Sequence, residues 1–250
     1  MTEYLSLLGT VRLFSGIESS DLYSMLNCVD AKTRTVRKGE IVLLAGDTPK
    51  HVGITLSGQL HIIREDYDGN RSLISVLEPG DIFAEALCCA GVTESPVSVV
   101  AYLDSNVLTM SFERVLGTCP NSCPFHKKLI TNMLGLIARK NLMMQSHMEI
   151  LSLKSVRARL LRYIESFVHE PFVRDTTAHS GIVNDVYTQA SITSKRSARN
   201  KGVTITIPLN REELANYLCV DRSALSHELM KMKKDGLIEY RKNEFTLLKH

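Results

Sequence analysis

The pattern of apolar and polar positions divides the chain into helical and extended stretches. Residues 1–29 carry apolar side chains at helical spacing, and the run SSDLYSMLN predicts a short helix capped by Ser19 or Ser20. From residue 31 to residue 112 the period becomes two, in short β-prone runs separated by turn residues such as Asp68-Gly69. Strands this short and this regularly spaced predict a sandwich, barrel or jelly roll.

A long helix is predicted from about Phe125 to Leu153, after a short one at residues 112–115. One face of the long helix has apolar residues alternately four and three positions apart, with one Asn among them. The members of this seam are Ile130, Leu134, Ile137, Asn141, Met144, Met148 and Leu151. A heptad seam of this kind predicts a two-stranded homodimer interface, because a single Asn at such a position fixes register and strand number.

The alternative for the long helix is ordinary packing on the β-rich domain. Further apolar residues broaden its apolar face, namely Leu136, Leu142 and Met143. Dimerisation and core packing can also use different faces of the same helix. Both interpretations therefore stay open at the level of the sequence.

Regular and irregular segments alternate in the rest of the chain. After Ser155, VRARLLRYIESFV predicts an Arg-rich amphipathic helix, and the later run VTITIP predicts a strand. Between them, residues 169–202 are polar, contain Gly and Ser, and show neither period. A structureless segment of this length is unusual inside a compact domain, so we interpret residues 169–202 as an insertion.

Residues 207–238 predict two short helices joined by a tight turn. Asn210 and Glu213 have the spacing of a capping box at the start of the first helix. Asp221 is the predicted N-cap of the second helix, and Gly236 supplies the left-handed residue that ends it. The apolar residues of each helix share one face, namely Leu214 and Leu218 in the first helix and Leu225, Leu229 and Met232 in the second.

Two such helices form a helix-turn-helix, in which the second helix can enter the major groove of DNA. Arg222 can bind guanine O6 and N7 with two N–H groups, and serine and histidine can donate to bases or phosphates. The predicted DNA-binding residues are Asn210, Arg211, Asp221, Arg222, Ser223, Ser226, His227 and Lys231. LIEYRKNEFTLL predicts a following hairpin, or wing, around Lys242-Asn243. A small helical core with a solvated polar face is the alternative, because helix-turn-helix patterns are degenerate.

Charge is unevenly distributed in a chain whose net charge is +3. From residue 195 onward there are twelve Lys and Arg against seven Asp and Glu, which indicates a polyanionic partner for this segment. No apolar run approaches the length of a membrane span, and the first residues lack the features of a secretion signal. The six Cys include no C-x-x-C and fit neither a disulfide framework nor a zinc ribbon. We therefore expect a cytoplasmic protein.

The order of β-roll, long helix and winged helix-turn-helix is similar to that of the Crp/Fnr superfamily of bacterial transcription regulators. LNREELANYLCVDRSALSHELMKMKKDGLI resembles the DNA-binding segment of that family, and GDIFAEAL resembles the phosphate-binding cassette of its cyclic-nucleotide-binding roll. The resemblance covers nearly all of the chain outside residues 169–202. It implies an α+β fold with an effector-binding β-roll (jelly roll) at 1–118, a dimerisation helix at 119–153 and a DNA-binding winged helix-turn-helix at 154–250.

For DNA recognition, the resemblance places Arg222, Ser223 and His227 at the positions that contact bases. His227 stands where the family usually has an Arg, and a histidine cannot make the two-pronged contact with guanine. The resemblance also implies a homodimer on a palindromic operator with half-sites about one helical turn apart. Double-stranded DNA, a second copy of the chain and a small-molecule effector are the expected partners, and RNA polymerase is a further partner that the resemblance allows.

The resemblance also implies a set of effector-binding positions, and several of them depart from the cyclic-AMP pattern. The implied positions are Gly80, Asp81, Ala84, Glu85, Ser95 and Ser98. Glu85 is kept, but Ala84 replaces a Gly, and Ser95 and Pro96 stand where the Arg-Ser pair that holds the cyclic phosphate would be. No Lys or Arg lies between residues 71 and 114. A buried phosphate without a cation is strongly unfavourable, so we predict that cyclic AMP is not the effector.

Other effectors stay open. Cys88, Cys89, Cys119 and Cys123 are candidates for a redox or iron–sulfur/thiol sensor, although the chain has no Cys before Cys28 to match the Fnr-type ligand pattern. Buried free thiols are the alternative. Haem is another option, but no motif selects among the four scattered histidines His51, His61, His126 and His147. A small organic anion or aromatic ligand in the roll is a third candidate effector.

An enzyme on a cupin-like roll is the rival class of function. Such a site needs metal ligands, usually His-x-His with a carboxylate. His51 and His61 do not have this spacing, and the chain contains no nucleophile elbow, P-loop or dinucleotide fingerprint. We therefore expect neither catalytic residues nor a metal site.

Overall fold

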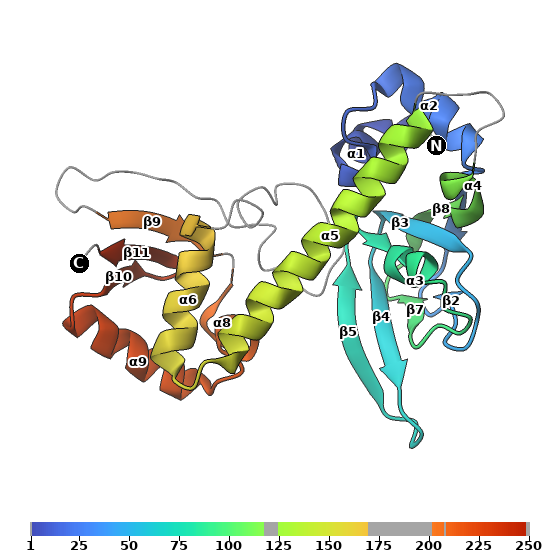
Figure 1. Cartoon of the computed structure of the whole chain (residues 1–250). Helices are drawn as coiled ribbons and strands as arrows, with labels where there is room; N and C mark the ends of the chain where they lie inside the picture. The colour runs from blue at the N-terminus through green and yellow to red at the C-terminus, as the bar shows by residue number, and fades with distance from the viewer. Residues whose placement is uncertain (1, 118–124, 170–201, 208, 249–250) are drawn as a thin grey trace. The chain divides into compact units, whose positions relative to one another are not determined.

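The computed structural model describes residues 2–117, 125–169, 202–207 and 209–248 (Figure 1). These residues form two compact units, and the boundary between the units falls within helix α5 (Phe125–Ser152), between Ala138 and Arg139. The interior of the predicted insertion at residues 169–202 lies outside the described residues. The functional division into residues 1–118, 119–153 and 154–250 remains a prediction.

The N-terminal unit contains two four-stranded antiparallel sheets, as the period of two predicted. The strand order is β1-β8-β3-β6 in one sheet and β2-β7-β4-β5 in the other. The strands are β1 Lys32–Val36, β2 Ile41–Leu43, β3 His51–Ser57, β4 Leu60–Glu65, β5 Arg71–Leu77, β6 Ile82–Phe83, β7 Ser98–Ala101 and β8 Ser105–Ser111. Strands β4 and β5 form the hairpin predicted at Asp68-Gly69, where Gly69 has the positive φ of +82° that the turn requires.

Short helices precede, interrupt and follow the strands of the roll. They are η1 Thr2–Tyr4, α1 Leu5–Thr10, η2 Arg12–Phe14, α2 Ser19–Cys28, α3 Glu85–Ala90 and α4 Phe112–Leu116. The prediction that Ser19 or Ser20 caps α2 is wrong, because the N-cap is Glu18 and no side chain bonds the helix end. Ile17 and Leu22, which flank the first turn, pack in the same apolar cluster. Apolar packing rather than a serine hydroxyl therefore sets where α2 begins.

Two apolar clusters stabilise the N-terminal unit. The first lies between the two sheets and includes Val36 and Val107 from one sheet and Leu60 and Val99 from the other. The second joins strands β3 and β8 to the helices. Its fully buried members include Leu22, Val52, Leu108 and Leu129.

The C-terminal unit has the predicted winged helix-turn-helix. Its helices are α6 Val156–His169, α8 Arg211–Tyr217 and α9 Arg222–Lys234, and its strands are β9 Gly202–Thr206, β10 Ile238–Arg241 and β11 Glu244–Leu248. The three strands form one antiparallel sheet in the order β10-β11-β9, with β10 and β11 as the wing. The predicted inward residues Leu214, Leu218, Leu225, Leu229 and Met232 are all buried in one cluster.

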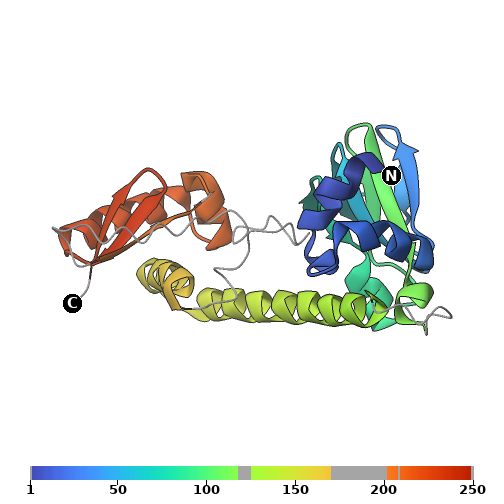
Figure 2. The same ribbon diagram turned by 90° about the horizontal axis from the view of Figure 1, so that it is seen from above.

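Helix α5 agrees with its predicted span to within one residue (Figure 2). One stripe of the helix is buried, with Leu129, Met133 and Leu136 in the N-terminal unit and Met143 and Ile150 in the C-terminal unit. The last turns of α5 are thus part of the helix-turn-helix core. Within the described residues, no helix combines the length and apolar content that spanning a membrane requires.

The predicted dimer seam lies on a neighbouring stripe of α5. Leu134, Met144 and Met148 are 64%, 61% and 69% exposed, Asn141 is exposed, and Ile130 and Ile137 are half-buried. Core packing and the exposed part of the seam therefore use different faces of the helix, while the seam residue Ile137 also packs against the core of the N-terminal unit. Leu142, which we grouped with the core-facing residues, is 44% exposed, because it lies one position before the buried Met143 and so points away from the core.

Candidate DNA-binding surface and effector cassette

Helix α8 begins with the predicted capping box. The Asn210 Oδ1 atom accepts hydrogen bonds from the backbone N–H groups of Glu212 and Glu213 at 2.9 and 3.0 Å, and Glu213 Oε2 accepts from the Asn210 N–H at 2.7 Å. The Asn210 side chain therefore has a structural role in the same place where we predicted a DNA contact. Asp221 is at the N-cap position of α9, as predicted, but its side chain makes no capping bond.

Long-range contacts hold the turn between α8 and α9. The Arg159 side chain on α6 donates through Nη1 to the carbonyls of Leu218 and Cys219 at 2.9 and 3.1 Å, and through Nε to that of Leu153 at 2.8 Å. Cys219 adopts a φ of +50°, which positions the chain to turn directly into α9. Carbonyls at the end of a helix have no intrahelical partner, so Arg159 stabilises this turn.

Helix α5 also contacts the helix-turn-helix directly. The His147 ring stacks on the Tyr217 ring with centroids 4.1 Å apart and an interplanar angle of 12°. The Nε2 atom of His147 lies 2.9 Å from the Tyr217 carbonyl oxygen at the end of α8. A displacement of the last turns of α5 would therefore act on the helix that precedes the turn.

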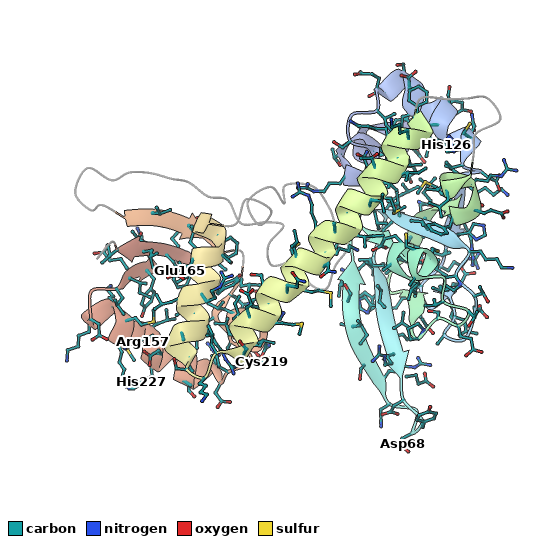
Figure 3. All side chains as sticks on the ribbon, in the orientation of Figure 1. Asp68, His126, Arg157, Glu165, Cys219 and His227 are labelled. Carbon is teal, nitrogen blue, oxygen red and sulfur yellow. The ribbon has the colours of Figure 1, made fainter. Side chains whose placement is uncertain are left out.

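The outward face of α9 is a free polar surface. Arg222, Ser223, His227 and Lys231 are exposed, and their side chains make no hydrogen bond or ion pair within the described part of the chain. Ser226 is half-buried and its hydroxyl donates to the Arg222 carbonyl at 2.9 Å. Figure 3 labels His227 on this helix. The predicted outward residues are thus all on one helix, and four of the five are exposed.

Two ion pairs connect α9 to α6. The Arg157 Nε atom lies 2.5 Å from Glu228 Oε1, and its Nη2 atom lies 2.8 Å from Asp235 Oδ2. Both carboxylates raise the pKa of Arg157, chiefly through these hydrogen bonds. Glu228 is in the middle of α9 and Asp235 follows its last residue, so one guanidinium orients the helix at two points. Sequence reasoning missed this pair because its members are far apart along the chain.

The wing is anchored by Arg211, which we predicted as a DNA contact. Its Nη2 donates to the Lys242 carbonyl at 3.1 Å, and its guanidinium lies over the Tyr240 and Phe245 rings at 5.4 and 5.6 Å. Burial lowers the pKa of Arg211. Beside it is an open pocket of about 510 Å³ lined by Leu209, Asn210, Arg211, Glu213, Lys242 and Asn243. Arg211 therefore holds the wing tip against the start of α8.

The cassette in the roll surrounds the short helix α3. Ala84, its N-cap, has left-handed backbone angles of φ 62° and ψ 0°, a conformation that favours the Gly expected from the family pattern. Glu85 is 3% exposed. The Gly80 N–H donates to the Thr55 carbonyl at 2.8 Å, and Asp81 Oδ2 accepts from the Glu78 N–H at 2.7 Å. These positions are therefore engaged in the turn itself.

The two predicted serines of the cassette also bond to the backbone. The Ser95 hydroxyl donates to the Val97 carbonyl at 2.7 Å, and Ser98 Oγ accepts from the Ala45 N–H at 2.9 Å. Neither serine lies beside a cation of the cassette, because the chain has no Lys or Arg between residues 71 and 114. The arrangement retains the backbone of a phosphate-binding cassette without its phosphate-binding charge.

Two of the four cysteine candidates, Cys88 and Cys89, lie in the described residues, next to each other on helix α3. Cys88 is buried, donates its S–H to the Pro49 carbonyl at 3.3 Å, and has a pKa raised to about 12, mainly by burial. Cys89 is exposed, and partial burial of its thiol still raises its pKa. Cys119 and Cys123 lie outside the described residues. Within the described ranges no three His, Cys, Asp or Glu side chains form a group able to hold a metal ion.

The four histidines considered for haem lie on three elements, namely β3, β4 and helix α5. His61 on β4 stacks on Tyr102 with centroids 4.2 Å apart, and burial lowers its pKa. His126 Nε2 lies 3.0 Å from the Arg114 carbonyl oxygen, and His147 contacts Tyr217 as described above. His51 is exposed on β3. Haem ligation by these residues is untested.

Sequence comparison matches both halves of the chain to domain families. The cyclic nucleotide-binding domain matches residues 33–121, and the Crp-like helix-turn-helix domain matches residues 190–250. No curated protein sequence matches the chain.

Solved structures similar to this chain include three bacterial regulators. The catabolite activator protein of Thermus thermophilus is 17% identical over 94% of this chain and 93% of its own, with a TM-score of 0.49. DNR of Pseudomonas aeruginosa is 18% identical over 100% and 96%, with a TM-score of 0.49. CLP of Xanthomonas campestris, described as a c-di-GMP responsive global regulator, is 17% identical over 93% and 100%, with a TM-score of 0.49.

The two domain matches cover more than half of the chain between them and occur in the order that the fold shows. A roll of the cyclic-nucleotide-binding type is followed by a long helix and a Crp-like helix-turn-helix. Regulators with these two domains bind DNA through the second and an effector through the first. The chain therefore belongs to the Crp/Fnr superfamily of DNA-binding transcription regulators.

Proposed function

We propose that this regulator acts as a homodimer that binds a palindromic operator through α9 and responds to a ligand of the roll other than cyclic AMP. The observation that carries the proposal is the outward face of α9, where four predicted DNA-binding side chains are exposed and uncommitted among the described residues. The opposite face of the same helix is buried. The apolar core therefore holds one face of α9 and leaves these polar side chains exposed to solvent.

The seam of α5 supports dimerisation. Leu134, Met144 and Met148 expose large apolar side chains on one stripe of a 28-residue helix. An exposed apolar stripe at heptad spacing buries itself when a second identical helix pairs with it, and the exposed Asn141 selects the register. A two-fold dimer presents two copies of α9, so the operator should be palindromic with half-site centres about 34 Å apart.

The cassette supports the exclusion of cyclic AMP. A cyclic phosphate that leaves water needs a positive charge or several hydrogen-bond donors. Residues 72–113 supply no Lys or Arg, and the Ser95 hydroxyl already donates to the Val97 carbonyl. A less strongly anionic ligand suits this site better.

Ligand binding in the roll would control DNA binding through helix α5. Its Met143, His147 and Ile150 pack in or against the helix-turn-helix core, and its Leu129 and Met133 pack in the core of the roll. A ligand that favours one pairing of the two seams would favour one spacing of the two α9 helices. This is a population shift between arrangements that exist without the ligand.

Three measurements test the proposal. Sedimentation equilibrium should give a dimer for the wild type and a monomer for Met144→Glu, with Glu149→Ala on the same helix as a control that stays dimeric.

Selection of duplexes from a random DNA pool should yield palindromes, and their affinity should fall steeply with salt. Titration calorimetry with cyclic AMP should show no binding. A monomeric wild type, selected duplexes without two-fold symmetry, or micromolar cyclic-AMP binding would each contradict the corresponding part.

A further inference from the structure

Helix α9 presents one large apolar side chain to solvent. Met230 is 58% exposed, and no other large apolar side chain in the described part of residues 202–248 is comparably exposed. It follows His227 by three positions and Ser223 by seven, so the three share one face of the helix. Met230 is therefore part of the free surface of α9 and not part of its core.

The core gives no reason for an apolar residue at this position. The buried face of α9 is complete with Leu225, Leu229 and Met232, which are 0–1% exposed. Surface positions on the same helix carry Lys231, Lys233 and Lys234. A single exposed apolar side chain is common on protein surfaces. On the face that the proposed function places in the major groove, however, the Met230 side chain lies against base edges, where it can bury its area favourably only on an apolar group.

The major groove offers one apolar group at base edges, the C5-methyl of thymine. A methionine suits such a contact, because its three rotatable bonds and polarizable sulfur adapt to the exact position of a small apolar group. Lys231, next to Met230, can bind a neighbouring phosphate and fix the register. Lys231 would thus fix the position of α9 on the DNA backbone, and Met230 would recognise the base.

We propose that Met230 contacts the C5-methyl group of a thymine in each operator half-site. This inference rests on the proposed function, in which α9 lies in the major groove. Met230 is eight residues after Arg222, which is about 12 Å along the helix axis. With a rise of about 3.4 Å per base pair, the thymine lies at most about four base pairs from the pair that Arg222 contacts, because about 12 Å is the largest separation along the DNA that an inclined helix allows.

The test uses full-length protein and duplexes selected from a random DNA pool by the wild type. Each thymine of the best duplex is replaced in turn by deoxyuridine, which removes only the methyl group, and dissociation constants are measured by fluorescence anisotropy at constant salt. One symmetry-related pair of thymines should prove sensitive. Loss of a buried methyl should weaken binding about fourfold per half-site and about fifteenfold for both.

Variants at position 230 identify the side chain responsible. Met230→Ala should bind the thymine and uracil duplexes with affinities within about twofold of each other, and Met230→Leu should keep most of the discrimination, because burial of apolar area carries the effect. Lys231→Ala is the matched control: it should weaken binding to both duplexes equally and reduce the salt dependence, while keeping the thymine preference.

The outcomes separate this inference from the proposed function. If the wild type selects no sequence from the pool, the proposed function fails. If it selects a palindrome in which no thymine-to-uracil change matters, or if Met230→Ala keeps the full thymine preference, the Met230 contact is wrong while DNA binding stands. Far-UV circular dichroism and thermal unfolding of each variant, compared with those of the wild type, test whether the variant is folded.

Discussion

The outward face of α9 and the cassette around α3 both carry a recognisable family motif, yet the structure uses their polar residues differently. On α9, Arg222 and His227 are exposed and uncommitted among the described residues. In the cassette, the Ser95 hydroxyl donates to the Val97 carbonyl, Ser98 Oγ accepts from the Ala45 N–H, and Glu85 is buried. A polar side chain can serve a ligand only where the fold has not already used its hydrogen-bonding capacity.

Charge separates the two regions as well. Helix α9 ends with three Lys in its last turn, which suits both the helix dipole and a phosphate backbone. The cassette has no cation between residues 71 and 114. Helix α9 therefore combines the helix-turn-helix scaffold with basic side chains, whereas residues 72–113 of the cassette contain no Lys or Arg.

The sharpest test compares a thiol from each region. Cys88 in the cassette is buried with a pKa of about 12, whereas Cys219 in the helix-turn-helix turn is exposed. Because only the thiolate reacts, iodoacetamide at pH 8 should label Cys88 at least about a thousandfold more slowly than Cys219, as measured by peptide mass spectrometry. The rate at Cys88 should rise with pH up to about 12. Equal labelling of both thiols in folded protein would show that the cassette is open.

Arg222→Ala should give the next largest effect, in DNA affinity. Loss of a two-pronged guanine contact in each of two half-sites should weaken specific binding by about 100-fold to 1,000-fold. Arg71→Ala is the control in the other unit, where Arg71 pairs with Glu65 on the β4–β5 hairpin, and it should leave affinity unchanged. Anisotropy titrations on a selected palindrome measure both. If Arg222→Ala and Arg71→Ala lose the same DNA affinity, the outward face of α9 is not the specific DNA-binding surface.

Arg157→Ala should weaken DNA binding by about threefold to tenfold. The change removes both ion pairs that orient α9, and partly exposed ion pairs contribute little individually. Arg162→Ala is the matched control, because Arg162 also lies on α6 but pairs with Glu149 of α5. It should have less effect on affinity. An Arg157 variant with unchanged affinity at low salt would show that the core alone orients α9.

Ala84→Gly should give the smallest effect, a stabilisation of about 1 kcal/mol in chemical unfolding. Ala84 has a φ of +62° and Cys219 one of +50°, and an L side chain is disfavoured in this region. Cys219→Gly should therefore stabilise by a similar amount. Ala86→Gly, at an exposed helical position of α3, should destabilise by about 0.5 to 1 kcal/mol. If Ala84→Gly lowers stability, the left-handed residue is not a strained one.

Local patterns predicted most of the elements. The long helix α5, the capping box at Asn210 and the turn at Gly69 depend on neighbours within a few residues, and the structure contains all three. The roles of Arg211 and Arg159 could not be predicted, because their partners lie 31 and about 60 residues away. Met230 could have been found on a helical wheel, where it shares the face of Ser223 and His227.

The amino-acid sequence by itself determined the element types, the buried face of each helix and the absence of a cation in the cassette, because periodicity, capping and composition act locally. Only the tertiary structure decided which polar side chains remain available. Arg211 supports the wing, Ser95 and Ser98 stabilise loops, and Arg222 and His227 stay free. The physical reason is that hydrogen-bond partners from distant segments are assigned only when the chain packs.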